Sequence, residues 1–168
     1  MRRLNRLVND FLAFARDREL EKNATDFKAS VEKSLYSLQS EIQQANVSLQ
    51  KDYDKLPELT HDEDAINQLV LNLTLNSLQS MNGQGTLTIR LKNTSRSGRS
   101  HIKMEIADTG QGFDVDPEKL FEPFYTTKTS GSGLGLAICK RLVEKHDGWM
   151  EVDSETGKGT TMRIYLPV

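Results

Sequence analysis

Four carboxamide side chains recur at helical spacing in the middle of the sequence. The apolar residues around them repeat every three to four positions, which predicts a helix over 66–81 with apolar residues on both flanks of the amides. Because the amides are four, four and three residues apart, they lie along one line between those flanks. They are Gln68, Asn72, Asn76 and Gln79.

These amides need partners. An unpaired buried amide costs on the order of 1 to 3 kcal/mol, so either the protein or a ligand must supply donors and acceptors, and we favour a ligand. An amide oxygen also suits a hard cation such as Mg²⁺, which prefers oxygen and usually keeps water and substrate phosphates in its shell. Asn72 or Asn76 could hold such an ion.

A carboxylate and two glycines follow one another at Asp108, Gly110 and Gly112, where a predicted strand ends. The glycines let other groups approach the backbone closely, and the carboxylate can accept a hydrogen bond from an exocyclic amine. Alone, an Asp-x-Gly-x-Gly stretch is more often a plain turn than a ligand site. This interpretation therefore depends on the other motifs.

A glycine-rich run over 131–135 leads directly into a predicted helix. Such a run offers free backbone N–H groups and the positive end of a helix dipole to a phosphate. It is neither the dinucleotide-binding fingerprint, since no βαβ unit surrounds it, nor a Walker loop, since no Gly-Lys-Ser/Thr follows. Lys128 lies just upstream, where it either meets phosphate charge or is a solvated loop lysine.

The elements that must hold these groups are helices and strands that alternate without strict βαβ order. We expect a polar, mobile loop over 95–100 and a flexible lid or phosphate loop over 126–135. The predicted helices cover 29–46, 62–81, 117–120 and 134–146, and the predicted strands cover 47–53, 86–92, 102–107, 150–152 and 162–166. The fold class is therefore α/β, a two-layer sandwich with a mixed sheet and helices on one face.

The composition excludes several classes of protein. The 168 residues suffice for one domain with a short attached element, and 22 Lys and Arg against 24 Asp and Glu give a net charge of −2. This balance predicts no nucleic-acid partner.

The single Cys139 cannot form an internal disulfide and is predicted to face the buried side of a helix. No apolar run approaches the roughly 18 residues of a membrane span, and we expect a soluble, cytoplasmic chain.

Five motifs then occur in a fixed order. They are Asn72-Leu73-Thr74-Leu75-Asn76, Asp108-Thr109-Gly110-Gln111-Gly112, Phe121-Glu122-Pro123-Phe124, the glycine run over 131–135 and Gly157-Lys158-Gly159-Thr160-Thr161. In this order they resemble the N-box, glycine boxes and phenylalanine box of the ATP-binding catalytic domain of bacterial sensor histidine kinases, over about 26–168. The stretch Phe-Glu-Pro-Phe-Tyr-Thr-Thr-Lys and Gln79 most resemble the nitrogen-regulator-like branch.

The resemblance implies the Bergerat ATP-binding fold, with ATP and Mg²⁺ in one site. Asp108 would bind the adenine amine, Asn76 would ligate Mg²⁺, and a lid over 124–132 would cover the phosphates. Asn72, Asn76 and Lys128 would be catalytic. The implied ATP-binding residues are Asn72, Asn76, Asp108, Gly110, Gly112, Phe121, Phe124, Lys128, Gly131, Ser132, Gly133, Leu134, Gly135 and Thr160.

The resemblance also implies a phosphotransfer function. The chain would donate the γ-phosphoryl group of ATP to a histidine, for relay to an aspartate of a response regulator. Residues 1–20, with an apolar helical seam over 4–15, resemble the C-terminal part of the second helix of the dimerisation domain, and 21–168 resemble the catalytic domain. The full-length kinase would be a homodimer, cytoplasmic or anchored at the inner face of the membrane, and the fragment either a monomer or an associating species.

The phosphoaccepting histidine is missing from the pattern. None of His61, His101 and His146 stands in the family's histidine-acid-x-x-x-proline context, so each is expected to be a structural or surface residue. We therefore expect that this chain does not phosphorylate itself. It would instead act on the histidine-bearing dimerisation domain of the same full-length protein.

Two departures from related proteins bear on the chemistry. Gln79 and Ser80 stand where many members carry a basic residue and an aromatic one, which leaves phosphate neutralisation to Mg²⁺ and Lys128. Asn72 stands where gyrase, chaperone and mismatch-repair ATPases place a glutamate that activates water, so transfer is expected rather than hydrolysis.

Two alternatives to the histidine kinase function stay open. One is an anti-sigma-type serine kinase on the same fold, which generally lacks a phenylalanine box. The other is a nonenzymatic nucleotide-gated interaction module.

Overall fold

The computed structural model describes residues 19–126 and 131–168. Its elements are β1 (Asn23–Thr25), α2 (Phe27–Ser37), α3 (Gln39–Gln44), β2 (Val47–Tyr53), β3 (Leu59–His61), α4 (Glu63–Ser80), β4 (Gly85–Arg96), β5 (Arg99–Asp108), α5 (Pro117–Leu120), α6 (Gly135–Lys145), β6 (Trp149–Glu155) and β7 (Gly159–Pro167). Within these residues, no helix combines the length and apolar character needed to cross a membrane.

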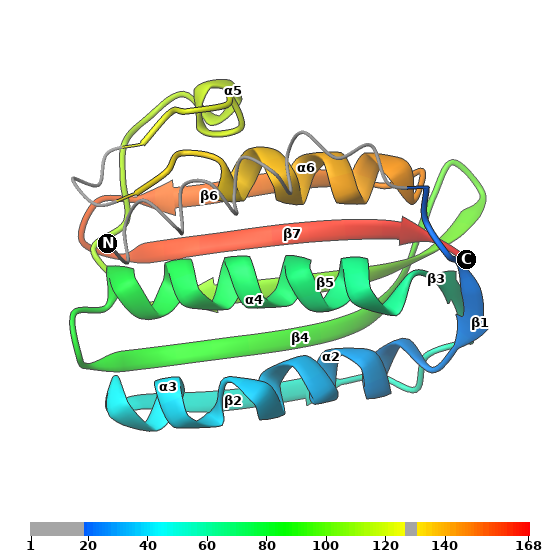
Figure 1. Ribbon diagram of the computed structural model, residues 1–168, viewed down its shortest axis with the longest axis horizontal. Helices are drawn as coiled ribbons and strands as arrows, with labels where there is room; N and C mark the ends of the chain where they lie inside the picture. The colour runs from blue at the N-terminus through cyan, green and yellow to red at the C-terminus, as the bar shows by residue number, and fades with distance from the viewer. Residues whose placement is uncertain (1–18, 127–130) are drawn as a thin grey trace.

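Five strands form one mixed sheet in the order β2-β4-β5-β7-β6, and α2, α4 and α6 cover one of its faces (Figure 1). β2 pairs parallel with β4, and the remaining neighbours pair antiparallel. The predicted α/β sandwich is confirmed. The helical seam predicted over 4–15 lies outside the described residues.

Alternating apolar residues of the central strands build the core. The buried apolar side chains of β4, β5 and β7 stand two residues apart, as the period of two in a strand requires. α4 packs Leu69 and Leu73 into the same cluster, and each is 1% exposed. The buried strand residues are Leu87, Ile89, Leu91, Ile102, Met104, Ile106, Met162, Ile164 and Leu166.

Local signals determine where α4 begins. The Asp62 carboxylate accepts a hydrogen bond from the Ala65 N–H at 2.9 Å, a cap that stabilises a helix by about 1 kcal/mol. Two acidic residues in the first turn complement the positive end of the dipole. The helix predicted over 62–81 is confirmed.

The helix predicted over 29–46 is wrong as one continuous element. The chain forms α2 and α3, which meet at Leu38, where φ is −100° and ψ is 7°. Leu35, Leu38 and Ile42 are all buried across this break. Because the apolar spacing continues through Leu38, the sequence pattern does not reveal the interruption.

The mobile loop expected over 95–100 is also wrong. β4 and β5 stay paired as far as Arg96 and Arg99. Ser97 and Gly98 between them have φ of 51° and 77°. Two consecutive positive φ values produce a tight hairpin turn whose twist matches that of the strands, so both strands run longer than predicted.

A buried polar cluster joins the beginning of α4 to the end of α6. The Asp62 N–H donates to Nε2 of His146 at 3.1 Å, and Nδ1 of the same ring lies 2.7 Å from the Leu142 carbonyl oxygen. Because Nε2 accepts, Nδ1 carries the proton and the ring is neutral. Burial is the largest cause that lowers the pKa of His146, and the Lys22 charge lowers it further, whereas the Leu142 carbonyl and Asp62 raise it.

We expect the free energy of unfolding to fall as the pH drops from about 7.5 to about 5.5. The unfolded chain takes up a proton near the ordinary histidine pKa of about 6.5, while folded His146, whose pKa is lowered, resists it. The contribution of neutral His146 to the free energy of unfolding is present above about pH 6.5 and is lost below it. At one pH unit below 6.5, the loss is at most about 1.4 kcal/mol. Urea unfolding of wild type and His146→Gln at both pH values measures this. Equal pH dependence in the two proteins would contradict the assignment.

Candidate functional site

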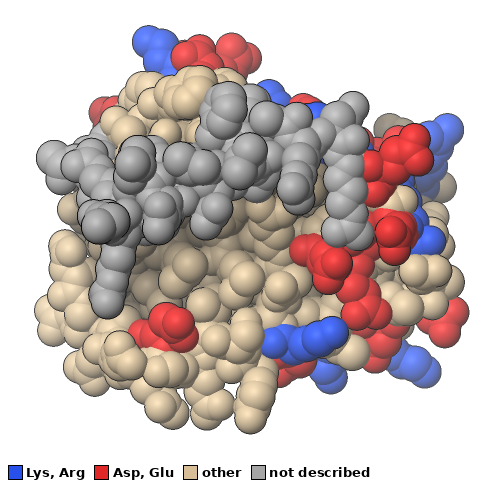
Figure 2. Space-filling view, in the orientation of Figure 1, with Lys and Arg blue, Asp and Glu red and all other residues tan. Residues whose placement is uncertain are grey.

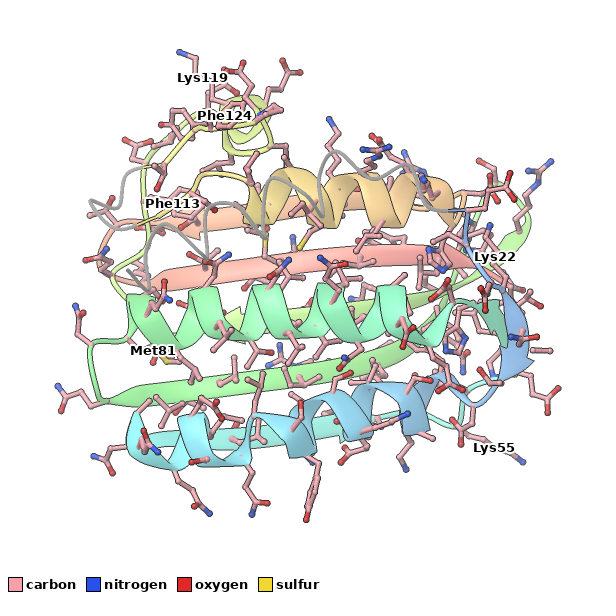
Figure 3. The ribbon with its side chains drawn as sticks, viewed as in Figure 1. Lys22, Lys55, Met81, Phe113, Lys119 and Phe124 are labelled. Atoms are coloured by element: carbon pink, nitrogen blue, oxygen red, sulfur yellow. The ribbon has the colours of Figure 1, made fainter. Side chains whose placement is uncertain are left out.

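The site is a cavity at the end of the sheet where α4 finishes. Its walls come from α4, the segment after β5, the beginning of α6 and the beginning of β7. Figure 3 shows Met81 and Phe113 at this end, and Lys22 at the opposite one. The cavity is lined by Asn72, Leu73, Leu75, Asn76, Ser77, Gln79, Ser80, Asp108, Gln111, Gly112, Phe113, Leu120, Tyr125, Thr126, Gly131, Ser132, Gly133, Gly135, Leu136, Thr160 and Met162.

Most of the predicted site residues meet at this cavity, but some do not. Gln68, the first amide of the predicted row, lies outside the lining, as do Gly110, Phe121, Phe124 and Leu134. Lys128 lies outside the described residues. The predicted residues that line the cavity are Asn72, Asn76, Gln79, Asp108, Gly112, Gly131, Ser132, Gly133, Gly135 and Thr160.

The Asp108 carboxylate is held in one orientation. Its Oδ1 accepts hydrogen bonds from the Gly110 N–H and from the Ser80 hydroxyl, each at 2.9 Å. A Cβ at Gly110 would overlap the Ser80 oxygen, so only glycine permits this approach. Among the described residues no donor reaches Oδ2, and this oxygen is left as an acceptor beside the cavity. Gly110 therefore supports the site from outside its lining.

Thr160 lies beside Asp108 because the two residues are partners in the pairing of β5 with β7. The Ser154 hydroxyl lies 3.1 Å from the Gly159 carbonyl oxygen, 2.9 Å from the Phe113 nitrogen and 3.0 Å from the Thr160 hydroxyl. If its one proton goes to the carbonyl, Ser154 accepts from both other groups. Thr160 then donates to Ser154, and its lone pairs stay available on the cavity side.

Sequence reasoning missed Ser154 and the contact between Ser80 and Asp108. Alternation along β6 puts Ser154 on the same face as Met150 and Val152, so a longer predicted strand would have found it. The pair Ser80 and Asp108 is separated by 28 residues. No local pattern links two residues so far apart.

The opposite end of the cavity can hold phosphates. Asn72 and Asn76 on α4 share this wall with the glycine run that opens α6. The first N–H groups of α6 have no partner within the helix and carry the positive end of its dipole. Among the described residues of the lining none is basic, and Asp108 is its one acid. Figure 2 shows acidic side chains gathered toward the other end of this face, where α4 begins.

Gly133 connects the glycine run to the phenylalanine segment. Its carbonyl oxygen accepts the Phe124 N–H at 2.9 Å. Its φ is +69°, and a Cβ there would overlap the Phe124 backbone. Phe124 is 63% exposed, and the Lys140 ammonium lies 5.7 Å from the centre of the Phe121 ring. Phe124 therefore contacts the glycine run, Phe121 contacts α6, and neither lines the cavity.

Cys139 lies behind the phosphate end. Burial raises the pKa of its thiol to about 12, and a hydrogen bond with the Asn72 side chain acts in the opposite direction. A thiol with such a pKa is protonated at neutral pH and is therefore a poor nucleophile. The prediction that Cys139 faces the buried side of a helix is confirmed.

Comparison with known proteins agrees with this geometry. Residues 61–168 match the family described as histidine kinase-, DNA gyrase B-, and HSP90-like ATPase. Sensor histidine kinase ZraS of Escherichia coli K12 is 34% identical over 168 residues, which are 99% of this chain and 35% of that protein. The sensory histidine kinase/phosphatase NtrB of Rhodobacter capsulatus is 36% identical over 135 residues, 74% of this chain and 38% of that protein.

A solved structure supports the same relationship. The crystal structure of full-length ShkA in complex with AMPPNP has a TM-score of 0.83 and 27% sequence identity, over 98% of this chain and 35% of that one. The chain thus spans about a third of the length of the curated relatives it matches. The expected resemblance to the nitrogen-regulator branch agrees with the match to NtrB. Both the cavity and these matches lead to one conclusion: the chain belongs to the histidine kinase-, DNA gyrase B-, and HSP90-like ATPases.

Proposed function

We propose that this chain is the ATP-binding catalytic part of a sensor histidine kinase. In this proposal it donates the γ-phosphoryl group of ATP to a histidine of a dimerisation domain in the same full-length protein, and the group then passes to an aspartate of a response regulator. The proposal is supported above all by one cavity. A fixed carboxylate acceptor lies at one end of it, and two amides lie opposite a helix N-terminus at the other end. The named relatives are sensor histidine kinases.

At the base end, Oδ2 of Asp108 would accept the exocyclic amine of adenine. Thr160 would complete this end, with its hydroxyl oriented by Ser154. Apolar lining side chains, including Leu120 and Met162, would contact the flat faces of the base. The acceptor oxygen selects a base that presents a donor at this position.

At the phosphate end, backbone N–H groups at the beginning of α6 would bind phosphate oxygens, and Asn72 would lie against them. The Asn76 amide oxygen fits Mg²⁺, which would neutralise phosphate charge. Among the described residues no group of three acidic, histidine or cysteine side chains forms a metal cage. A site with one amide ligand suits a Mg²⁺ ion that enters already bound to the phosphates of ATP. We propose Lys128 as a further contact to phosphate.

The site is built for transfer and not for hydrolysis. Activating a water molecule requires a base that takes its proton, and the Asn72 amide cannot do so. No carboxylate lines the phosphate end among the described residues, since Asp108 binds at the base end. The nucleophile would be an imidazole brought from the dimerisation domain, to which we propose residues 1–20 belong. We place this reaction in the cytoplasm, where ATP is available.

Replacement of Asn76 by leucine is expected to remove the Mg²⁺-dependent part of ATP binding. A lost metal contact weakens binding by about tenfold or more. Calorimetric titration with ATP, with and without Mg²⁺, measures this, and a product assay is expected to find negligible ADP. Gln68→Leu is the matched control, because Gln68 lies on the same amide row but outside the cavity lining. An unchanged Mg²⁺ dependence in Asn76→Leu would exclude Asn76 as the ligand.

Replacement of Gly133 by alanine is expected to weaken ATP binding by about tenfold or more, since it displaces the glycine run from Phe124. Gly98→Ala is the control, because Gly98 also has a positive φ but open space around it. Both variants carry backbone strain of about 1–2 kcal/mol, visible as lower melting temperatures. Only Gly133→Ala should lose affinity, and equal affinities for the two variants would refute the role given to this contact.

A further inference from the structure

We propose that Ser80 is a positioning residue for base selection: its hydroxyl fixes the Asp108 carboxylate so that one oxygen faces the cavity as an acceptor for an amino-substituted purine. This assignment rests on the proposed function, since it deepens the role of the same cavity. Ser80 is the last residue of α4 and lines the cavity itself. It also stands where the sequence departs from the family pattern.

The Ser80 hydroxyl has two acceptors within reach. Its oxygen lies 2.9 Å from Oδ1 of Asp108 and 2.8 Å from the Ser77 carbonyl oxygen. A hydroxyl has one proton, and an ionised carboxylate is a stronger acceptor than a helix carbonyl. The proton is therefore donated to Asp108.

Two donors then act on the same carboxylate oxygen. The Gly110 N–H and the Ser80 hydroxyl both reach Oδ1, and the described residues supply no donor to Oδ2. With Oδ1 held twice, rotation of the carboxylate would break both hydrogen bonds. Oδ2 of this cavity-lining residue is then the oxygen left for a ligand amine, and the carboxylate is already ordered before the ligand binds.

Ser80 is itself held in place. Its carbonyl oxygen accepts the Gln111 N–H at 3.1 Å, which joins the end of α4 to the segment after β5. The space that a Cβ of Gly110 would need is filled by the Ser80 side chain. Ser80, Asp108 and Gly110 therefore interlock, and the hydroxyl is aimed before any nucleotide binds.

A purely structural role for Ser80 can be tested against a matched residue. Ser37 is the last residue of α2, and its hydroxyl donates to the Ser34 carbonyl oxygen, three residues earlier, at 2.7 Å. The Ser80 oxygen lies at a similar distance, 2.8 Å, from the Ser77 carbonyl oxygen, although its proton is donated to Asp108. Ser37 has no carboxylate partner among the described residues, so Ser37→Ala removes a serine hydroxyl from the end of a helix without removing a contact to a carboxylate.

The experiment measures the affinity of wild type, Ser80→Ala and Ser37→Ala for Mg-ATP and for purine riboside triphosphate, which lacks the 6-amine. We expect Ser80→Ala to bind ATP about tenfold more weakly and the purine nucleotide within about twofold of wild type, so that selectivity between them falls. The unchanged purine affinity also reports that the variant is folded. We expect Ser37→Ala to match wild type with both nucleotides.

Equal losses for both nucleotides in Ser80→Ala, or no loss for either, would overturn the assignment while leaving the proposed function in place. Binding of neither nucleotide by the wild-type chain would overturn the proposed function and the assignment with it. A loss of selectivity in Ser37→Ala as large as that in Ser80→Ala would also overturn it, since the carboxylate contact would then not be the cause.

Discussion

The packing of α4 on the sheet is the constraint on which the rest of the structure depends. Leu69 and Leu73 are buried against the central strands, and their burial fixes the rotation of the helix. Asn72 and Asn76 belong to the same rigid helix and must face the cavity once that rotation is set. The positions of the ligand-facing amides are therefore determined by apolar contacts in the core. Any change that rotates α4 would disturb both stability and the site.

The two ends of the cavity differ in how firmly they are held. At the base end, hydrogen bonds join α4, the segment after β5 and the turn between β6 and β7, where the Gly157 N–H reaches the Gln111 carbonyl oxygen at 2.7 Å. At the phosphate end the walls are the glycine run and the α4 amides. Because the carboxylate at the base end is already ordered, the site can select among bases without a free-energy cost for ordering that side chain when the ligand binds. In the proposed function, a phosphate end framed by the glycine run and the α4 amides suits a reaction whose nucleophile comes from another domain.

Much of this arrangement could be predicted from the sequence, because its signals are local. The cap at Asp62 and the repeated apolar spacing mark α4, and the glycine run marks the beginning of α6. The break at Leu38 could not be predicted, since the apolar pattern continues through it, and β1 and β3 are too short to show alternation. The contact between Ser80 and Asp108 depends on tertiary structure alone. Phe124 stays a predicted ATP contact on the resemblance alone, and in the structure this exposed residue lies outside the cavity lining.

The most direct test of the proposed function is transfer of phosphate to a supplied histidine. The chain is mixed with Mg-ATP labelled in the γ-phosphate and with the histidine-bearing dimerisation domain of the same kinase. We expect acid-labile label on the supplied domain and none on this chain, whose histidines His61, His101 and His146 are all buried. Binding of ATP without any transfer would contradict the account in favour of a nonenzymatic module, and acid-stable label on a protein serine would contradict it in favour of a serine kinase.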